Sequence, residues 1–565
     1  MKRKGIFFGL FVLILSIFCA MLIGCSPRQE PVVRTIMFQT DGGTAIAQKA
    51  NEVKEFPVSE KEDYLIEGWY RDSSKHTRVS FPFTATEDTT LYAAWVRIAD
   101  GNVGIQYEET EGGYIAARFY DPSYSVCIPD THAFKPVLGV KEGFFGTRMY
   151  VHRIYLGKNV RNVQEELYRC LNLTAFTVHP DNEVYTVQNG SLYNRKNREI
   201  EAVPRKTSGT FSFDCNLSEN ALSYNNLITT VEMGENASAP ARAFSDMNAL
   251  EAINVNAANR TFSSENGILY SKDKSILYKY PQNRNESEFT LPDSTQTILE
   301  EAFSSNESLR KIRIGRGLSD FDDFSAIPNL EEITVSEENA SYSSANGVLY
   351  NKDKTILCRF PCAKKGAFDM EETVETIDSY AFAYASGVTE VILPKRLKKI
   401  SAYAFLGCLG LQTILSEEES ELEEIETAAF ALCTSLTKLT VTTRRPPRAA
   451  AVGMLDSVAE GFQLVIPSNA MEIYENAWAF AKRYLSASGP ALTTYTVTFI
   501  SGDGSAIEPV HGVYIAKEPV PTPNKEGFVF AGWYDNEAFL GKKVAFPYII
   551  EDHVLLYADY AEVFD

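Results

Sequence analysis

The side chains best suited to catalysis or metal binding are scattered along this chain. Histidine is the commonest general base and metal ligand near neutral pH, but no two of the six histidines stand at the spacing of a helical metal pair. These histidines are His76, His132, His152, His179, His511 and His553. No nucleophile elbow, glycine-rich phosphate loop or calcium loop accompanies them. The sequence therefore predicts no catalytic residue, no metal site and no cofactor.

Two acidic runs could imitate functional carboxylates. The run from Ser416 to Glu424 is mostly glutamate, and paired carboxylates can act as general acid and base. A solvated turn between repeats explains this run better. Asp320 to Asp323 could touch a cation, although a polar loop is the simpler interpretation.

The cysteines favour a packing role over a redox or metal role. Nine are present, and Cys19 and Cys25 lie at the N-terminus. The other seven are Cys127, Cys170, Cys215, Cys358, Cys362, Cys408 and Cys433. An odd number with irregular spacing argues against a disulfide framework, and no histidine stands near the close pair Cys358 and Cys362. We expect small buried side chains, and the sequence leaves open whether any pair forms a disulfide.

Cys25 stands where a thiol acquires a lipid. A basic start (residues 2–4) precedes an almost unbroken apolar run from Ile6 to Ile23, which ends at Gly24 and Cys25. This order resembles the signal of bacterial lipoproteins, in which a peptidase cuts before an obligatory cysteine that carries diacylglycerol. The resemblance implies a signal peptide over residues 1–24 and a lipidated Cys25 with a linker over residues 25–34. The alternatives are an uncleaved helix or a plain secretory signal, which normally ends in small residues at alternate positions.

Length and charge limit the remaining classes of function. A chain of 565 residues is too long for one core and should form several domains. Its formal net charge of −20 repels phosphate backbones, so nucleic acid is not an expected partner. The same charge repels anionic lipid head groups, so attachment to a membrane must come from the lipid anchor.

A repeat dominates the middle of the chain. Its clearest copies, residues 173–178, 250–255 and 330–335, read apolar, two variable, apolar, one variable, apolar. The last two apolar positions alternate, as a short strand with one buried face requires. Such strands end at residues 156, 178, 213, 233, 255, 291, 314, 335, 370, 393, 416, 441 and 466, and a fainter one ends at Ile128. Most intervals are 20–25 residues, which predicts one strand per coil of a leucine-rich-repeat solenoid.

Three longer intervals each contain a related insertion. The insertions share an Asn-Gly pair, an apolar segment and a tyrosine, and two of them continue into a Lys-Asp-Lys turn. This pattern predicts a β-hairpin inserted into every third coil. The regular spacing makes the insertions candidate binding sites, although a stabilising hairpin with a solvated turn is the simpler alternative. The candidate residues are Tyr193, Tyr270, Tyr350, Lys272, Asp273, Lys352 and Asp353.

A second signature lies between the strands. Ala-Phe pairs recur at Phe382, Phe405 and Phe430, and Cys408 and Cys433 each follow three residues after a phenylalanine. With the strand pattern, this strongly resembles the BspA-type leucine-rich repeats of bacterial surface proteins, over roughly residues 102–489. The resemblance implies a solenoid whose phenylalanines fill the interior. An amphipathic helix near residues 470–485, with Ile473, Tyr474, Ala477, Trp478 and Ala481 on one face, should cap the last coil.

The two ends of the chain repeat each other. Residues 35–98 and 494–563 both contain a short strand, a glycine-rich turn, a Gly-Trp-Tyr motif, a Phe-Pro pair and a final aromatic strand. Both resemble the internalin-type B-repeat, a small β-grasp-like extracellular module. The second copy departs from the first at Tyr560, which stands in place of a tryptophan. The expected fold is therefore mainly β, a solenoid with inserted hairpins between two small modules.

These expectations favour a recognition protein over an enzyme. The repeats and modules leave no segment long enough for a catalytic domain, although an accessory role in glycan processing remains an alternative. The other alternative is a passive component of the envelope or of an assembled complex. We expect a membrane-anchored lipoprotein at the outer membrane or cell surface, exposed to the outside, with an extracellular protein or glycan as its ligand. The identity of that ligand, the binding face of the solenoid and the oligomeric state stay open.

Overall fold

The computed structural model describes residues 33–145, 150–163, 166–300, 302–303, 305–321, 327–450, 453–513, 515–517 and 521–562. The expected signal peptide and Cys25 lie outside these residues. The chain divides into two compact units, residues 1–206 and 207–565. Strands dominate both units, which confirms the mainly β fold predicted from the repeats. In the described part of the chain, no helix has the length and apolar character needed to cross a membrane.

The first unit begins with a small module built on a four-stranded sheet. The strands are ordered β2 (Lys49–Ala50), β1 (Thr35–Gln39), β6 (Thr89–Arg97) and β4 (Tyr64–Tyr70). β1 and β6 are parallel, whereas β4 runs antiparallel to β6 at the edge of the sheet. One face of the sheet buries Ile36, Ile66 and Trp69, and the Trp69 indole nitrogen donates to the Pro57 carbonyl at 2.8 Å.

The first coils of repeats follow this module. β9 (Ser125–Ile128), β12 (Arg153–Leu156) and β14 (Ala175–Val178) lie parallel and in register. Beside them, β7 (Ile105–Thr110) and β8 (Gly113–Phe119) form a hairpin, and β8 also pairs with β11 (Lys135–Val140). The alternating side chains of these strands bury a core that includes Val126, Ile154 and Phe176.

The N-terminal module packs directly against these coils. The Ser125 hydroxyl donates to the Ile66 carbonyl at 2.6 Å, and the backbone N–H of Tyr124 donates to the Glu67 carbonyl at 2.8 Å. These bonds join the edge strand β4 to the start of β9. Leu65 and Val96 form an apolar cluster there with Cys127 and Tyr155.

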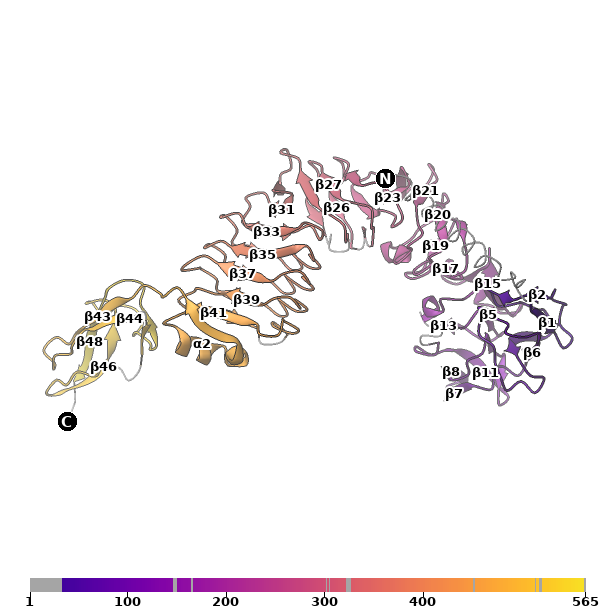
Figure 1. The fold of residues 1–565 in the computed structure, drawn as a ribbon, viewed down its shortest axis with the longest axis horizontal. Helices are drawn as coiled ribbons and strands as arrows, with labels where there is room; N and C mark the ends of the chain where they lie inside the picture. Colours follow the sequence, from indigo (N-terminus) through magenta and orange to yellow (C-terminus); the bar gives the residue numbers. More distant parts are fainter. Residues whose placement is uncertain are drawn as a thin grey trace, which may run out of the picture. The chain divides into compact units, whose positions relative to one another are not determined.

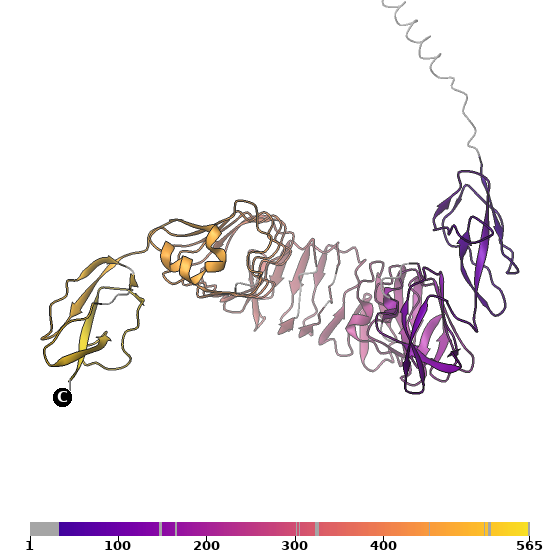
Figure 2. The same ribbon diagram turned by 90° about the horizontal axis from the view of Figure 1, so that it is seen from below.

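The second unit stacks similar coils, and the strands of successive coils pair in parallel sheets (Figures 1 and 2). A six-stranded sheet contains β33 (Gly366–Asp369), β35 (Val388–Leu393), β37 (Thr413–Ser416), β39 (Lys438–Thr440), β41 (Gln463–Pro467) and β42 (Leu485–Gly489). Earlier coils form the sheets of β18 (Gly209–Phe213), β20 (Ile228–Met233) and β21 (Ala252–Val255), and of β25 (Glu288–Thr290), β27 (Lys311–Ile314) and β29 (Glu332–Val335). Within a sheet the register places the central apolar residues over one another, for example Val391 over Ile414.

Aromatic rings fill the interior of the coils in unit 2. The rings of Phe382 and Phe405 stack at 4.6 Å, and Phe430 continues the stack at 5.4 Å from Phe405. The thiols of Cys408 and Cys433 donate to the carbonyls of Phe382 and Phe405, both at 3.0 Å. The seven described cysteines are free thiols, and all except Cys215 are buried.

Buried asparagines hold neighbouring coils together. The Asn259 amide donates to the carbonyls of Gly234 and Ala237 in the previous coil, both at 2.9 Å, and its side-chain oxygen accepts two backbone N–H groups. Asn182 and Asn339 repeat this arrangement. Each residue is at most 1% exposed, so its four polar partners compensate for the loss of water.

The insertions have one more strand than the sequence predicts. β22 (Phe262–Glu265), β23 (Ile268–Ser271) and β24 (Ile276–Lys279) form an antiparallel meander with two turns. The meander of β30 (Tyr342–Ala345), β31 (Val348–Asn351) and β32 (Ile356–Arg359) is equivalent, and in unit 1 β15 (Tyr185–Gln188), β16 (Ser191–Asn194) and β17 (Glu199–Ala202) repeat it. The prediction of a single hairpin omitted the Asn-Gly turn, where Asn266 and Gly267 both have positive φ (51° and 77°).

The end of the solenoid is covered by a short broken helix instead of one continuous helix (Figure 1). α2 (Met471–Ala477) ends at Trp478, and a 3-10 turn, η3 (Ala479–Tyr484), follows. Tyr474, Trp478 and Ala481 are buried as expected, whereas Ala477 faces solvent because the helix ends there.

A second small module ends the chain. Its sheet is ordered β44 (Val510–Val513), β43 (Tyr495–Ile500), β48 (Val554–Glu562) and β46 (Phe528–Tyr534), which is the strand order of the N-terminal module. Its core contains Val497, Trp533 and Leu556. The Trp533 indole donates to the Pro521 carbonyl at 2.9 Å, as Trp69 does to Pro57.

Candidate binding site

The tyrosines of the insertions belong mainly to the core. Tyr270 and Tyr350 are each 1% exposed, and Tyr193 is half-buried. Burial raises the pKa of the Tyr270 and Tyr350 hydroxyls well above the ordinary value. A ligand could reach the rings of Tyr270 and Tyr350 only if the meanders opened, so these two side chains stabilise the insertions.

The charged residues at the tips are exposed but already engaged. The Lys272 ammonium donates to the Ala257 carbonyl at 2.9 Å, and Lys352 donates to the Glu337 carbonyl at 3.0 Å. The Asp273 carboxylate accepts bonds from the Ser271 hydroxyl and from the N–H and hydroxyl of Ser275, which lower its pKa to about 2. These bonds shape a turn, as Asp side chains commonly do.

Asp353 occupies the equivalent tip of the next insertion and is exposed. The tip candidates of these two insertions therefore lie on the surface, while their tyrosines do not. The surface offered by each tip is small because it consists of one tight turn.

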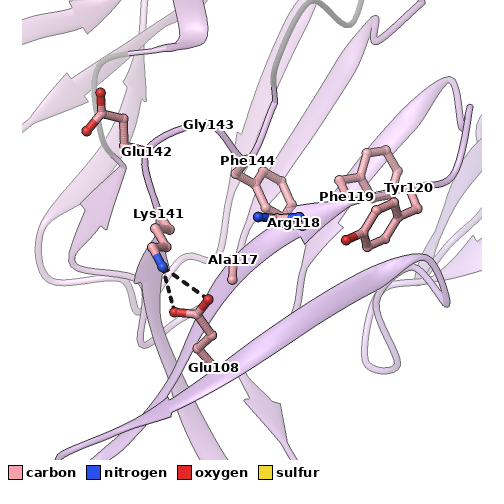
Figure 3. A pocket seen from close by; sticks show the side chains of 9 residues that line it. All are labelled: Glu108, Ala117, Arg118, Phe119, Tyr120, Lys141, Glu142, Gly143 and Phe144. Atoms are coloured by element: carbon pink, nitrogen blue, oxygen red, sulfur yellow. Dashed lines mark hydrogen bonds and ion pairs between the residues drawn. The ribbon is translucent and has the colours of Figure 1, made fainter.

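A pocket of about 390 Å³ lies beside β8 in unit 1 (Figure 3). Lys141 and Glu108 of its lining form an ion pair, with the ammonium 2.8 and 3.1 Å from the two carboxylate oxygens. Arg118 also lines the pocket. Both members of the ion pair are about half exposed, at 52% each, so water screens their charges. Nothing in this lining forms a nucleophile–base pair.

The most distinctive exposed feature is a tyrosine ridge, formed by Tyr380, Tyr384 and Tyr403 at the corners of two successive coils. All three have left-handed backbone angles, with φ of 57°, 61° and 58°. Such angles are uncommon for bulky residues and cost about 1 kcal/mol each. In the next coil, Gly407 takes the position of Tyr384 and also has a positive φ (67°). The turn can therefore form with glycine and does not require a tyrosine.

The backbone of the ridge is fixed by bonds between coils. The N–H of Tyr384 donates to the Leu406 carbonyl at 2.7 Å, and the N–H of Tyr403 donates to the Thr427 carbonyl at 3.1 Å. These corners turn the chain so that Ala381 and Phe382 enter the core. The interior requires the small residue and the phenylalanine but places no demand on an outward-facing tyrosine.

The ridge presents flat rings and unused hydroxyl groups. The rings of Tyr380 and Tyr403 are 5.2 Å apart and nearly parallel, at 10°. The Tyr384 ring packs over Gly407, since a Cβ at that glycine would lie 3.0 Å from the ring. Tyr380 and Tyr384 are 41% and 53% exposed, and the three hydroxyls bond to no residue in the described part of the chain.

Leu409 and Leu432 extend the exposed apolar character of the neighbouring coils, at 54% and 48% exposure. Rigid aromatic side chains of this kind contribute contact area at a low entropy cost and supply a hydrogen-bonding hydroxyl. The ridge is therefore suited to binding and contains no group for covalent chemistry.

The sequence contains one signal for the ridge. Tyr380 and Tyr403 each precede an Ala-Phe pair, 23 residues apart. Their outward orientation depends on the left-handed corner, which the sequence pattern alone does not reveal. Among the described residues, no group of three His, Cys, Asp or Glu side chains is placed to hold a metal ion.

Comparisons with known proteins agree with this architecture. The family model of the BspA type leucine rich repeat region matches six copies over residues 274–352 and 359–479. The Listeria-Bacteroides repeat domain matches residues 35–94 and 495–559. A search of curated proteins found no match.

Three solved structures are similar to parts of the chain. A leucine-rich repeat protein from Eubacterium ventriosum is 17% identical, covers 60% of this chain and 94% of its own, and has a TM-score of 0.35. A leucine rich cell surface protein from Faecalibacterium prausnitzii is 18% identical, covers 69% and 94%, and has a TM-score of 0.32. The pneumococcal vaccine antigen PcpA is 13% identical, covers 73% and 86%, and has a TM-score of 0.26.

The matched families are repeat scaffolds of surface proteins, and such scaffolds are typically non-enzymatic. Both predicted resemblances, to BspA-type repeats and to internalin-type modules, are confirmed by the family models. The chain thus contains a BspA type leucine rich repeat region between two Listeria-Bacteroides repeat domains.

Proposed function

We propose that this protein is a cell-surface recognition protein that binds an extracellular protein or glycan through the tyrosine ridge. The observation that carries the proposal is the presence of Tyr380, Tyr384 and Tyr403 at left-handed corners. Those corners disfavour bulky residues, and the interior does not use these rings. A binding role explains why costly residues stand there with their hydroxyls unused.

Tyrosine is enriched at recognition surfaces because one end of its ring is apolar and the other forms hydrogen bonds. Two parallel rings on adjacent coils offer an extended surface to a flat sugar ring or to the apolar part of a protein epitope. Individual aromatic anchors of this kind contribute about 1–2 kcal/mol each to binding.

Membrane attachment through Cys25 belongs to the same proposal. A diacylglycerol thioether would hold the mature chain at the outer membrane or cell surface with the solenoid facing outward, because two acyl chains anchor stably where one does not. A Cys25→Ala variant should lose its lipid label and leave the membrane fraction. A membrane-bound, unlabelled variant would contradict the anchor without affecting the ridge.

The binding experiment uses an array of glycans and extracellular-matrix proteins, probed with the mature chain carrying Cys25→Ala. The test variant replaces Tyr380, Tyr384 and Tyr403 with Asn, which tolerates left-handed backbone angles and should therefore preserve the fold. The matched control replaces Lys274 and Lys354 with Asn, because these tip residues also have left-handed angles (φ of 60° and 56°).

Loss of an array signal in the ridge variant alone would support the proposal. Equal signals from the ridge variant and the wild type would exclude the ridge, and loss in the tip control alone would place binding at the insertions. The absence of any array signal would favour the passive envelope or assembly role. Turnover of an arrayed glycan would favour the accessory glycan-processing role.

A further inference from the structure

The C-terminal module has an exposed apolar face. Its sheet turns Val497, Trp533 and Leu556 toward the core, and on the opposite side it presents Val529 and Leu555, which are 58% and 48% exposed. Ile500 adds an exposure of 38% at the end of β43. The register aligns Ile500 with Tyr557 and Tyr557 with Tyr534 across three strands. We call Ile500, Val529, Leu555, Tyr534 and Tyr557 the outer face.

In the N-terminal module, the position equivalent to Val529 is buried against the repeats. Leu65 precedes its Gly-Trp-Tyr motif by the same distance as Val529 does, but Leu65 is only 6% exposed. The side chains that cover it are Cys127 and Tyr155 of the first coils. The same position is therefore covered in one module and open in the other.

The covering residues occupy one defined row of the solenoid. Tyr155 pairs with Cys127, and each lies between two buried apolar residues of its strand, so it faces outward from the sheet. In unit 2 this row is polar in several coils, where it holds Ser212, Glu232 and Asn254, and Thr290, Arg313 and Thr334.

The row becomes apolar again at Ile392 and Leu415, which pair with each other and are partly exposed. We call these two residues the apolar row. The chain thus contains a module face on which Val529 takes the position of Leu65, and a solenoid row on which Ile392 and Leu415 take the positions of Cys127 and Tyr155.

Charged residues show the same correspondence between the two modules. In the N-terminal module, the Arg78 guanidinium donates to the Glu67 carbonyl at 2.7 Å. Burial raises the pKa of Asp121, at the start of the coils, and the nearby positive charge of Arg78 partly opposes this shift. Lys543 takes the place of Arg78 in the second module and donates to the Ala531 carbonyl at 2.7 Å. Asp369 pairs with Ile392 at the apolar row. Its carboxylate could therefore form an ion pair with Lys543 of a second copy.

The module cannot use its own solenoid for this contact in the arrangement described, because it is already held elsewhere. Arg444 donates to the carbonyls of Thr493 and Ile550 at 3.1 and 3.2 Å, and the Lys517 ammonium pairs with Glu472 of the cap. Ile515 joins the core of the last coils. These contacts use the side of the module that carries β45 (Ile515–Ala516) and leave the outer face free.

We propose that the outer face of the C-terminal module docks onto the apolar row of a second copy of this chain. The interface is heterologous, since two different surfaces meet, and each copy has one of each. Such contacts connect copies head to tail into open chains or closed rings. Anchored copies at one surface would then form a connected layer, in which several binding sites act together.

The test is sedimentation velocity of the mature chain carrying Cys25→Ala, without detergent and at concentrations up to about 100 µM, where even weak specific association is measurable. The variants are Val529→Asp on the module and Leu415→Glu on the row. Val103→Asp is the matched control, because Val103 is likewise an exposed valine (101%) but lies in the first unit. The wild type and the control should self-associate, and each single variant should be monomeric.

Mixing the two variants separates this proposal from a symmetric contact between two modules. The module of the Leu415→Glu chain is intact, and so is the row of the Val529→Asp chain. The mixture should therefore form a one-to-one complex, which a symmetric contact between outer faces would not allow. A monomeric wild type would overturn the proposal, as would a mixture without complex or a dimer that survives Val529→Asp.

Val529 is so exposed that its replacement should not disturb folding, and circular dichroism would check Leu415→Glu. If that variant unfolds, Ile392→Thr replaces it, since Thr440 already occupies the same row. Binding to the array by the monomeric variants reports on the tyrosine ridge separately.

Discussion

The two end modules share one design but use it differently. In both, an indole donates to a proline carbonyl, and a second aromatic residue closes the glycine-rich turn. The Trp95 indole donates to the Thr40 carbonyl at 3.0 Å, and the Tyr560 hydroxyl donates to the Ser501 carbonyl at 2.8 Å. The departure at Tyr560 therefore preserves the hydrogen bond, because either side chain places a donor at the same carbonyl.

The two modules contact the repeats through different sides. The N-terminal module uses the edge and outer face of β4, and the C-terminal module uses the β45 side and the Arg444 contacts. The module core thus sets the fold, while a few surface residues decide how the module is attached. Val529 and Leu65 illustrate this, since equivalent positions are 58% and 6% exposed.

The largest contrast is expected from an aspartate at this position. Leu65→Asp would bury an unpaired carboxylate between the module and the first coils, at a cost of several kcal/mol. Val529→Asp should change the stability of the monomer by less than about 0.5 kcal/mol, since the position is exposed. Chemical denaturation of the two variants measures both values, and equal costs would contradict the difference in attachment.

A smaller contrast is expected from pH. His152 stacks on Tyr124 at 4.0 Å in the contact between the N-terminal module and its coils, and burial lowers its pKa to about 4 from an ordinary 6.5. In the folded state, burial disfavours the protonated His152 imidazole. His152 therefore contributes stability above pH 6.5 that is lost as the pH falls toward 4. Since His152 is partly accessible, the expected loss is about 2 kcal/mol.

The test compares the pH dependence of unfolding of the first unit in wild type and His152→Gln. The variant should lack the part of the slope between pH 6.5 and 4 that His152 supplies, whereas His76→Gln, an exposed control, should keep it. An unchanged slope in His152→Gln would show that other groups cause the acid sensitivity.

Arg444→Ala should loosen the C-terminal module by removing its contacts to Thr493, Ile550 and Glu419. The Arg444 side chain is only 16% exposed, so the expected cost is about 2 kcal/mol, with part of it from the carbonyls left without a donor. Hydrogen exchange should increase at the Arg444 contacts and in β45 but not in the N-terminal module. Increased exchange in both modules would mean that the variant destabilises the solenoid.

The smallest effect is expected from Tyr560→Phe, which removes only the hydroxyl that bonds to Ser501. A loss of about 1 kcal/mol in the C-terminal module is typical of one such hydrogen bond. Trp95→Tyr should weaken the equivalent hydrogen bond of the N-terminal module by a smaller amount, because the tyrosine hydroxyl can still donate to the Thr40 carbonyl. Thermal unfolding of the separate transitions would measure both, and a larger loss in Trp95→Tyr would show that packing outweighs the bond.

Much of the solenoid could be predicted from the sequence because its signal is periodic. The predicted strand ends at 213, 255, 314 and 393 coincide with the ends of β18, β21, β27 and β35. Each coil places an apolar residue at the same position of its strand, so every copy supports the assignment of the others. The segment from Phe211 to Val231 has a weak pattern, yet it forms β18 and β20 because neighbouring strands supply the pairing.

Other features depend on contacts that a single repeat does not encode. The strand before each Asn-Gly pair was missed because its sequence is mostly polar, as in β22 (Phe-Ser-Ser-Glu) and β30 (Tyr-Ser-Ser-Ala). Tyr270 and Tyr350 were predicted as candidate binding residues, but both side chains are buried within the insertions. The outward orientation of Tyr380 and Tyr403 follows from left-handed corners, and the attachment of the modules follows from residues far apart in the chain.

The most direct test of the proposed recognition role is the affinity of the ridge variant for the strongest ligand that the array identifies, measured by biolayer interferometry. If three rings contribute about 1–2 kcal/mol each, replacing Tyr380, Tyr384 and Tyr403 with Asn should weaken binding at least about 100-fold. The control with Lys274→Asn and Lys354→Asn should bind like the wild type. An affinity of the ridge variant within about twofold of the wild type would contradict the account.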